Sequence, residues 1–241
     1  MKKNENKSGI MEVVFILDRS GSMCGLEADT IGGFNSILQK QKKESDNVIW
    51  STVLFDDRHK VIHNRVPIEE VEPLTERDYY VRGCTALLDA IGRAVHHIGM
   101  CHKYMRAEDV PEKTLFVITT DGMENASREY TYRKVKEMIE FEKEQYGWEF
   151  MFLGANIDAV SVASRMGISQ SRTSCYINDG EGISKNYESF GRVMAKMSRM
   201  EAFDEADLDD VREDFRTRSK KSRGRGEYVR SNFRRYYRKP V

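Results

Sequence analysis

Uninterrupted apolar runs alternate along this chain with amphipathic segments, and this alternation limits the possible folds more than any other feature. The first run, EVVFILD at 12–18, is continuous in apolar residues between its two acids, as expected of a strand covered on both faces. Similar runs follow at 47–57, 113–122 and 148–156. Right-handed crossovers between such units produce a mostly parallel sheet with helices on both faces. The sequence therefore predicts a doubly wound α/β fold.

The segments between these runs complete the expected architecture. The segment 59–68, HKVIHNRVPI, alternates in polarity and contains Pro67, which is typical of an antiparallel edge strand turned back on its neighbour. A short last strand is expected at 174–179. Amphipathic helices are expected at 28–45, 86–105, 130–147, 158–167 and 183–200.

The chain divides into four segments by composition. We expect a tail at 1–9, a single folded domain at 10–200, an acidic segment at 201–215 and a basic tail at 216–241 that is disordered when free. The basic tail holds eleven Lys or Arg and one acid, although the net charge of the whole chain is zero. Such asymmetry is typical of an interaction arm rather than of a folded core.

Polar oxygens gather where two of the predicted strands end. Asp18 ends the first strand and begins an Asp-x-Ser-x-Ser pattern with Ser20 and Ser22, while Asp121 follows the strand LFVITT. Alternate residues of an extended loop point the same way, so the three side chains of the pattern can converge. Ligands of doubly wound sheets bind beyond the carboxyl ends of the strands, and Thr85 in RGCTALLDAIG is a further candidate there.

The chemistry of these groups favours a hard cation. Two carboxylates neutralise a divalent ion, and hydroxyls fill coordination positions without adding charge. No His or Cys stands among the candidates, so the set suits Mg²⁺, with Mn²⁺ or Ca²⁺ as alternatives, better than zinc.

Three motifs together resemble a known family. DRSGS at 18–22, GCTALLDA at 83–90 and TTDG at 119–122 occur in the order found in the von Willebrand factor A domain, and the chain is similar to the intracellular bacterial branch of that family over roughly 10–200. The resemblance implies a Rossmann-like fold with a metal-ion-dependent adhesion site (MIDAS). It implies that Asp18, Ser20, Ser22 and Thr85 contact the metal with Asp121 nearby, and that an acidic side chain of a partner protein fills an open coordination position. The expected function is therefore that of a non-enzymatic, metal-dependent protein-binding module.

Two structural interpretations, both of them helix capping, and one enzymatic interpretation are alternatives to a metal-dependent binding site. The Ser/Gly turn at 20–22 can simply cap a helix, and Thr85 can be a plain N-cap. A Mg²⁺-dependent phosphotransferase or hydrolase of the haloacid dehalogenase type also begins with a strand and an Asp, but it needs a second acid where Ser20 stands. His97 and Cys101 lie one helical turn apart, and we interpret them as a surface histidine and a half-buried thiol rather than as zinc ligands.

The basic tail supports an alternative function. Its Arg residues alternate with Tyr, Phe and Gly, a composition that can bind phosphates and stack on single-stranded bases. The chain would then be a nucleic-acid-binding protein with a structural metal site, or its tail would bind an acidic protein.

The compartment is expected to be the cytoplasm. Four scattered cysteines without a CxxC pair indicate reduced thiols, and no apolar stretch approaches the ~18 residues that a membrane-spanning helix requires.

Overall fold

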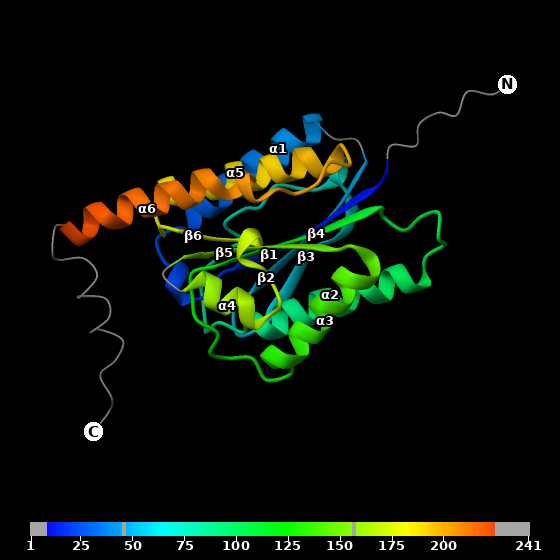
Figure 1. Ribbon diagram of the computed structural model, residues 1–241, viewed down its shortest axis with the longest axis horizontal. Coiled ribbons are helices and arrows are strands. Elements are labelled where there is room, and N and C mark those ends of the chain that lie inside the picture. Colours follow the sequence, from blue (N-terminus) through cyan, green and yellow to red (C-terminus); the bar gives the residue numbers. More distant parts are fainter. Residues whose placement is uncertain (1–8, 45–46, 156–157, 225–241) are drawn as a thin grey trace.

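One six-stranded sheet forms the centre of the molecule (Figure 1). The computed structural model describes residues 9–44, 47–155 and 158–224. The strands in chain order are β1 (Met11–Asp18), β2 (Val48–Phe55), β3 (His59–Pro67), β4 (Lys113–Thr120), β5 (Glu149–Ala155) and β6 (Thr173–Tyr176). The helices are α1 (Glu27–Glu44), α2 (Leu87–Tyr104), α3 (Tyr132–Tyr146), α4 (Ala159–Arg165), α5 (Gly180–Ser198) and α6 (Asp209–Gly224).

The strand order, β3-β2-β1-β4-β5-β6, confirms the predicted doubly wound α/β fold. All neighbouring strands are parallel except β3, which pairs antiparallel with β2 at one edge, as its Pro67 and alternating pattern predicted. The chain crosses over in both directions from the central pair β1 and β4, so the loops after these two strands diverge. This divergence opens the edge of the sheet at Asp18 and Thr120.

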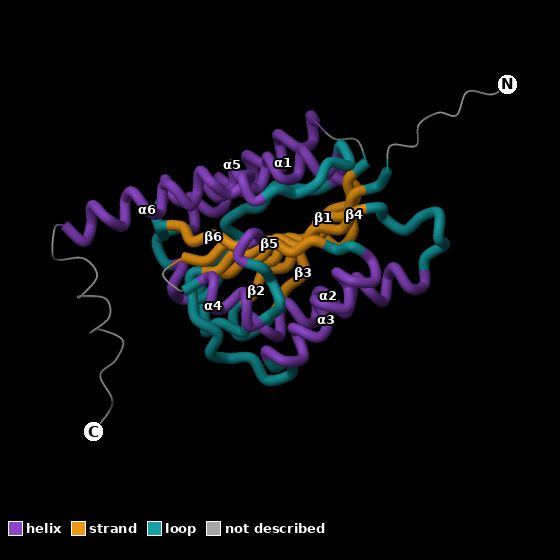
Figure 2. Tube along the Cα trace, viewed as in Figure 1, coloured by secondary structure: helices purple, strands orange, loops and turns teal. Residues whose placement is uncertain are grey.

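The two faces of the sheet carry separate cores. Along β1, Val13, Phe15 and Leu17 face one core, which α1 and α5 cover, while Val14 and Ile16 face the other, which α2, α3 and α4 cover (Figure 2). This alternation explains why β1 is apolar at consecutive positions rather than at every second one. Burial on both faces fixes the register of β1, because a slip by one residue would exchange the two faces.

The folded domain does not end at residue 200, which corrects the predicted boundary. Phe203, Leu208 and Val211 are buried in the same core as α5, and α6 contacts both α5 and β6. Because 201–215 is mostly acidic, its composition gave no sign that these three apolar side chains are buried. Helix α6 then continues through Gly224 and crosses the expected boundary at 215/216, so the first part of the basic tail is helical. The rest of the basic tail, 225–241, and nearly all of the tail predicted at 1–9 lie outside the described residues.

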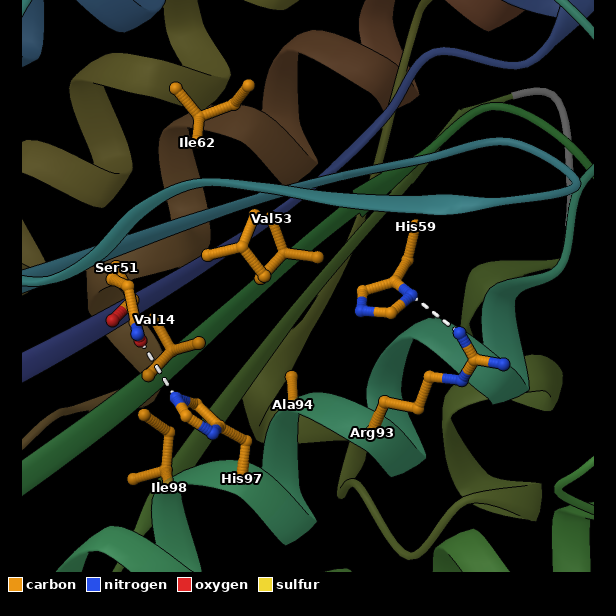
Figure 3. Close-up of a pocket in the computed structure, with 11 residues that line it drawn as sticks. Val14, Ser51, Val53, His59, Ile62, Arg93, Ala94, His97 and Ile98 are labelled. Atoms are coloured by element: carbon orange, nitrogen blue, oxygen red, sulfur yellow. Dashed lines mark hydrogen bonds between the residues drawn. The ribbon is translucent and has the colours of Figure 1, made fainter.

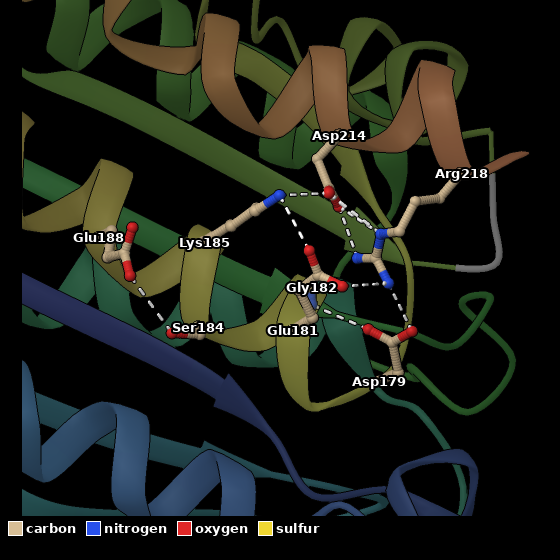
Figure 4. Close-up of polar contacts among 8 residues, drawn as sticks. All are labelled: Asp179, Glu181, Gly182, Ser184, Lys185, Glu188, Asp214 and Arg218. Carbon is tan, nitrogen blue, oxygen red and sulfur yellow. Dashed lines mark hydrogen bonds and ion pairs between the residues drawn. The ribbon is translucent and has the colours of Figure 1, made fainter.

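Ion pairs around the buried Asp214 carboxylate attach α6 to the beginning of α5 (Figure 4). Arg218 pairs with Asp214 on its own helix and with Asp179, the N-cap residue of α5, at 2.6 Å. Lys185 of α5 reaches Asp214 at 2.5 Å from the other side. Because Asp214 is only 5% exposed, these contacts offset the cost of burying its charge. The acids of this segment thus serve to attach α6 to the domain.

Within the described ranges, no helix combines the length and apolarity needed to cross a bilayer.

Candidate metal centre

The five candidate residues lie on three loops at the edge where β1 and β4 end. Asp18 is the last residue of β1, and the loop after it makes one short helical turn over Gly21–Met23. Asp121 directly follows β4, whose Thr119 pairs with Leu17 of β1. This register brings the two carboxylates, 103 positions apart in the sequence, to the same edge of the sheet.

A third loop brings Thr85 to this edge. The Gly21 amide donates to the Gly83 carbonyl at 3.1 Å and ties the loop before α2 to the loop after β1. Gly83 has a φ of 66°, and a Cβ there would lie 2.5 Å from Oδ1 of Asp57, so this turn favours glycine. Thr85 precedes Ala86, the N-cap residue of α2, so its hydroxyl is not used as the cap of that helix.

Three hydroxyls converge above Gly122. A Cβ built on this glycine would lie 2.7 Å from Oγ1 of Thr85, 3.2 Å from Oγ of Ser22 and 3.5 Å from Oγ of Ser20. The two serine hydroxyls are 3.1 Å apart, and Ser22 donates to Asp121. The structure therefore brings together the side chains that the sequence predicted, and the absence of a side chain on Gly122 leaves room between them.

The carboxylate of Asp18 is almost fully buried and is held by neutral donors. Its Oδ1 accepts from the Ser20 amide at 2.7 Å, and its Oδ2 accepts from Oγ1 of Thr120 at 2.5 Å. Burial raises the pKa of Asp18 above its usual value, although the hydrogen bonds from Thr120 and Ser20 partly counteract this. Tyr79 donates to the carbonyl of Asp18 at 2.6 Å and fixes the backbone at the end of β1.

Asp121 is in a similar environment. Burial raises its pKa to about 7, and the nearby charge of Asp18 acts in the same direction. Its Oδ2 accepts from Nδ2 of Asn178, at the end of the loop after β6, at 2.7 Å. Among the described residues, neither Asp18 nor Asp121 is within ion-pair distance of a Lys, Arg or His.

These observations fit a divalent cation held by oxygen ligands. Burial raises the pKa of both carboxylates, and the charge of Asp18 raises that of Asp121 further. A divalent cation beside them would favour their ionised forms. In the described part of the chain no three His, Cys, Asp or Glu side chains gather as a metal-binding group, so a cation at this site would need hydroxyl ligands. Oxygen ligands of this kind suit Mg²⁺, Mn²⁺ or Ca²⁺.

Sequence reasoning missed several residues that support the site. Thr120 and Asn178 hold the two carboxylates, and Oδ1 of Asn125 accepts from the Thr85 amide at 2.9 Å. Asp89 accepts from three consecutive backbone amides at 128–130 and holds the loop after β4 against α2. The available signal was position rather than residue type, because Thr120 ends β4 and Asn178 lies two residues after β6, at the same edge of the sheet as Asp18.

Comparison with solved structures reveals similar folds at low sequence identity. The PilB minor pilin from Streptococcus sanguinis is 12% identical, with 78% of this chain and 61% of that chain covered and a TM-score of 0.55. A von Willebrand factor type A protein from Catenulispora acidiphila is 13% identical, with 79% and 43% covered and a TM-score of 0.53. Proximal thread matrix protein 1 from the mussel byssus, in a structure with a zinc-occupied MIDAS motif, is 13% identical, with 78% and 46% covered and a TM-score of 0.51.

The fold is that of a von Willebrand factor type A domain. At these identities the similarity establishes the fold alone, and the chain spans less than two thirds of each of these proteins. Neither a protein-family model nor a curated protein sequence matches the chain.

Proposed function

We propose that this chain is a metal-dependent protein-binding module that uses the site at the ends of β1 and β4 to capture an acidic side chain of a partner protein. The observation that carries the proposal is the convergence of three hydroxyls above Gly122, next to the buried carboxylates of Asp18 and Asp121. The mussel protein with a zinc-occupied MIDAS motif has the same fold, which supports a divalent ion at the corresponding edge of this sheet.

Asp18, Ser20, Ser22, Thr85 and Asp121 would hold the ion. A bound divalent cation would supply an electrophilic position for a carboxylate of the partner. The serine and threonine hydroxyls of the chain are neutral, so they leave much of the ion's positive charge for that carboxylate. Gly122 keeps the space beside the hydroxyls free, and Thr120 and Asn178 hold the two carboxylates in place.

We propose Mg²⁺ as the physiological ion, with Mn²⁺ or Ca²⁺ as alternatives. All candidate ligands are hard oxygens, whereas sulfur and nitrogen ligands would favour zinc. We further propose that the module is not an enzyme, because Ser20 stands where a phosphotransferase of the haloacid dehalogenase type needs an acid. The four cysteines are all free thiols, which supports the proposal of a reducing compartment such as the cytoplasm.

Calorimetric titration of Mg²⁺ and Mn²⁺ into the wild type, Asp18→Ala and Asp109→Ala tests the metal site. Asp109 is an exposed acid on the loop between α2 and β4 and is the matched control. We expect one ion per chain for the wild type and the control, and no binding by Asp18→Ala. Equal binding by Asp18→Ala would refute the site.

A second experiment tests partner capture. Affinity capture of partners by the full chain is compared in Mg²⁺, in EDTA and at raised salt. The proposal expects binding that EDTA abolishes and that Asp18→Ala lacks. Binding that survives EDTA but weakens steeply with salt would instead indicate the basic tail as the interaction site.

A further inference from the structure

A pocket of about 310 Å³ lies between α2 and the hairpin of β2 and β3. It is on the α2 side of the sheet, and none of the five candidate metal ligands lines it (Figure 3). Its volume equals that of about ten water molecules in the liquid and falls at the lower end of the range of small-molecule sites.

The floor and walls of the pocket are apolar. Val14 of β1 and Val53 of β2 lie on the sheet side, and Ala94 and Ile98 lie on the helix side. Val61 of β3 also lines the pocket and is 43% exposed, one of the few large apolar side chains that the fold leaves open to solvent. The pocket therefore offers an apolar ligand aliphatic side chains from both the sheet and α2.

One end of the pocket carries hydrogen-bond donors. Arg93 of α2 donates to Nδ1 of His59 at 2.6 Å, and Arg93 also pairs with Glu129 outside the pocket. Because arginine only donates, Nδ1 of His59 must accept, and the ring proton of the neutral imidazole lies on Nε2. Burial, with the charge of Arg93, lowers the pKa of His59, which favours this neutral form. Within the described residues the Nε2–H group has no hydrogen-bond acceptor.

The other end is occupied by hydrogen bonds within the protein. Nε2 of His97 donates to Oδ1 of Asn64 at 2.8 Å and lies 3.9 Å from Sγ of Cys101. No third His, Cys, Asp or Glu joins His97 and Cys101 in the described part of the chain, so this end lacks the ligands of a metal site. Figure 3 shows the rings of His59 and His97 on opposite sides of Val53 and Ala94.

We propose that this pocket binds a small organic acid with an apolar body, whose carboxylate accepts from Nε2–H of His59 beside the Arg93 guanidinium. The aliphatic side chains of the sheet and α2 contact the apolar body. The site is independent of the metal centre and goes beyond the proposed function.

Benzoate is the probe, titrated into the full chain in EDTA with backbone amide shifts followed by NMR. Benzylamine has a ring of the same size with the opposite charge and is the matched control ligand. We expect benzoate to shift amides of β3 and α2 at millimolar concentrations and benzylamine to bind at least about tenfold more weakly, because the donors favour an anion. His59→Ala removes one charge-assisted hydrogen bond and should weaken benzoate about tenfold, whereas His96→Ala on the exposed side of α2 should not change it.

A pair of surface variants tests the proposal without disturbing the core. Val61→Glu adds a carboxylate at the pocket and Val61→Gln adds a neutral group of similar size, so benzoate should bind the Glu variant about fivefold more weakly than the Gln variant. Absence of shifts with benzoate, equal binding of benzylamine, or equal affinity of the two Val61 variants would each overturn the proposal.

Discussion

Metal affinity is expected to decrease as the pH is lowered, because the pKa of Asp121 is raised. Only the ionised carboxylate binds a cation, and burial places this pKa at about 7 in the metal-free protein. The group is then about 90% ionised at pH 8 and about 10% ionised at pH 6. The apparent dissociation constant for Mg²⁺ should therefore rise about tenfold between pH 8 and pH 6. The raised pKa of Asp18 acts in the same direction.

The same pKa shift affects the stability of the metal-free protein. Because the pKa is raised on folding, the folded state binds more protons, and stability falls as pH rises from about 4 through about 7. A shift of about 3 units corresponds to at most ~4 kcal/mol above pH 7. Saturation with metal should recover much of this loss.

Isothermal titration calorimetry at pH 6 and pH 8, in buffers of different ionisation enthalpy, measures both affinity and proton release. We expect about one proton released per metal at pH 6 and close to none at pH 8. The matched variant Asp121→Asn should bind more weakly and release fewer protons at pH 6. Wild-type dissociation constants that agree within about twofold at the two pH values, with no proton release, would refute this reasoning.

Three further substitutions give separate tests. Gly122→Ala places a methyl group 2.7 Å from Oγ1 of Thr85, so it should abolish metal binding in calorimetry while circular dichroism shows an unchanged fold; metal binding at wild-type affinity would contradict the arrangement. Leu208→Ala should lower the free energy of unfolding by about 2–5 kcal/mol in urea titration, because Leu208 belongs to the core, and an effect below about 0.5 kcal/mol would restore the boundary at residue 200. Arg218→Ala leaves buried Asp214 with fewer partners and should cost about 1–3 kcal/mol by the same assay, whereas the exposed Arg216→Ala should cost nothing measurable.

The sequence predicted the layers of the fold because a strand that is buried on both faces is apolar at consecutive positions. Strand β1 is apolar at consecutive positions and sits between two helical layers, and β3 has the Pro67 and alternation of an edge strand. Chirality and the alternation of elements predicted a mostly parallel sheet with helices on both faces. The sequence therefore contains most of the information that positions the site.

The sequence identified the candidate ligands that the structure brings together, but not the residues that support them. Asp18, Ser20 and Ser22 share a short motif, which local geometry alone can align. Thr120, Asn125 and Asn178 act through contacts that depend on how three loops pack, and residue type gives no signal for that.

The C-terminal boundary was wrong for a different physical reason. The segment after Met200 is rich in acids, and acidic composition is typical of solvated chain. The structure shows that several of these acids pair with Lys or Arg, as Asp207 does with Lys196 and Asp214 does with Lys185 and Arg218. A prediction from composition treats such charged residues as solvent-exposed. A few apolar side chains between them are nevertheless sufficient to attach the segment to the core.

Anomalous diffraction from crystals of the full chain grown with Mn²⁺ tests the central claim most directly. The account predicts an anomalous peak coordinated by the hydroxyls of Ser20 and Ser22 beside the carboxylates of Asp18 and Asp121, and its loss in crystals of Gly122→Ala. No peak among these side chains at saturating Mn²⁺, or a peak that persists in the Gly122→Ala crystals, would contradict it.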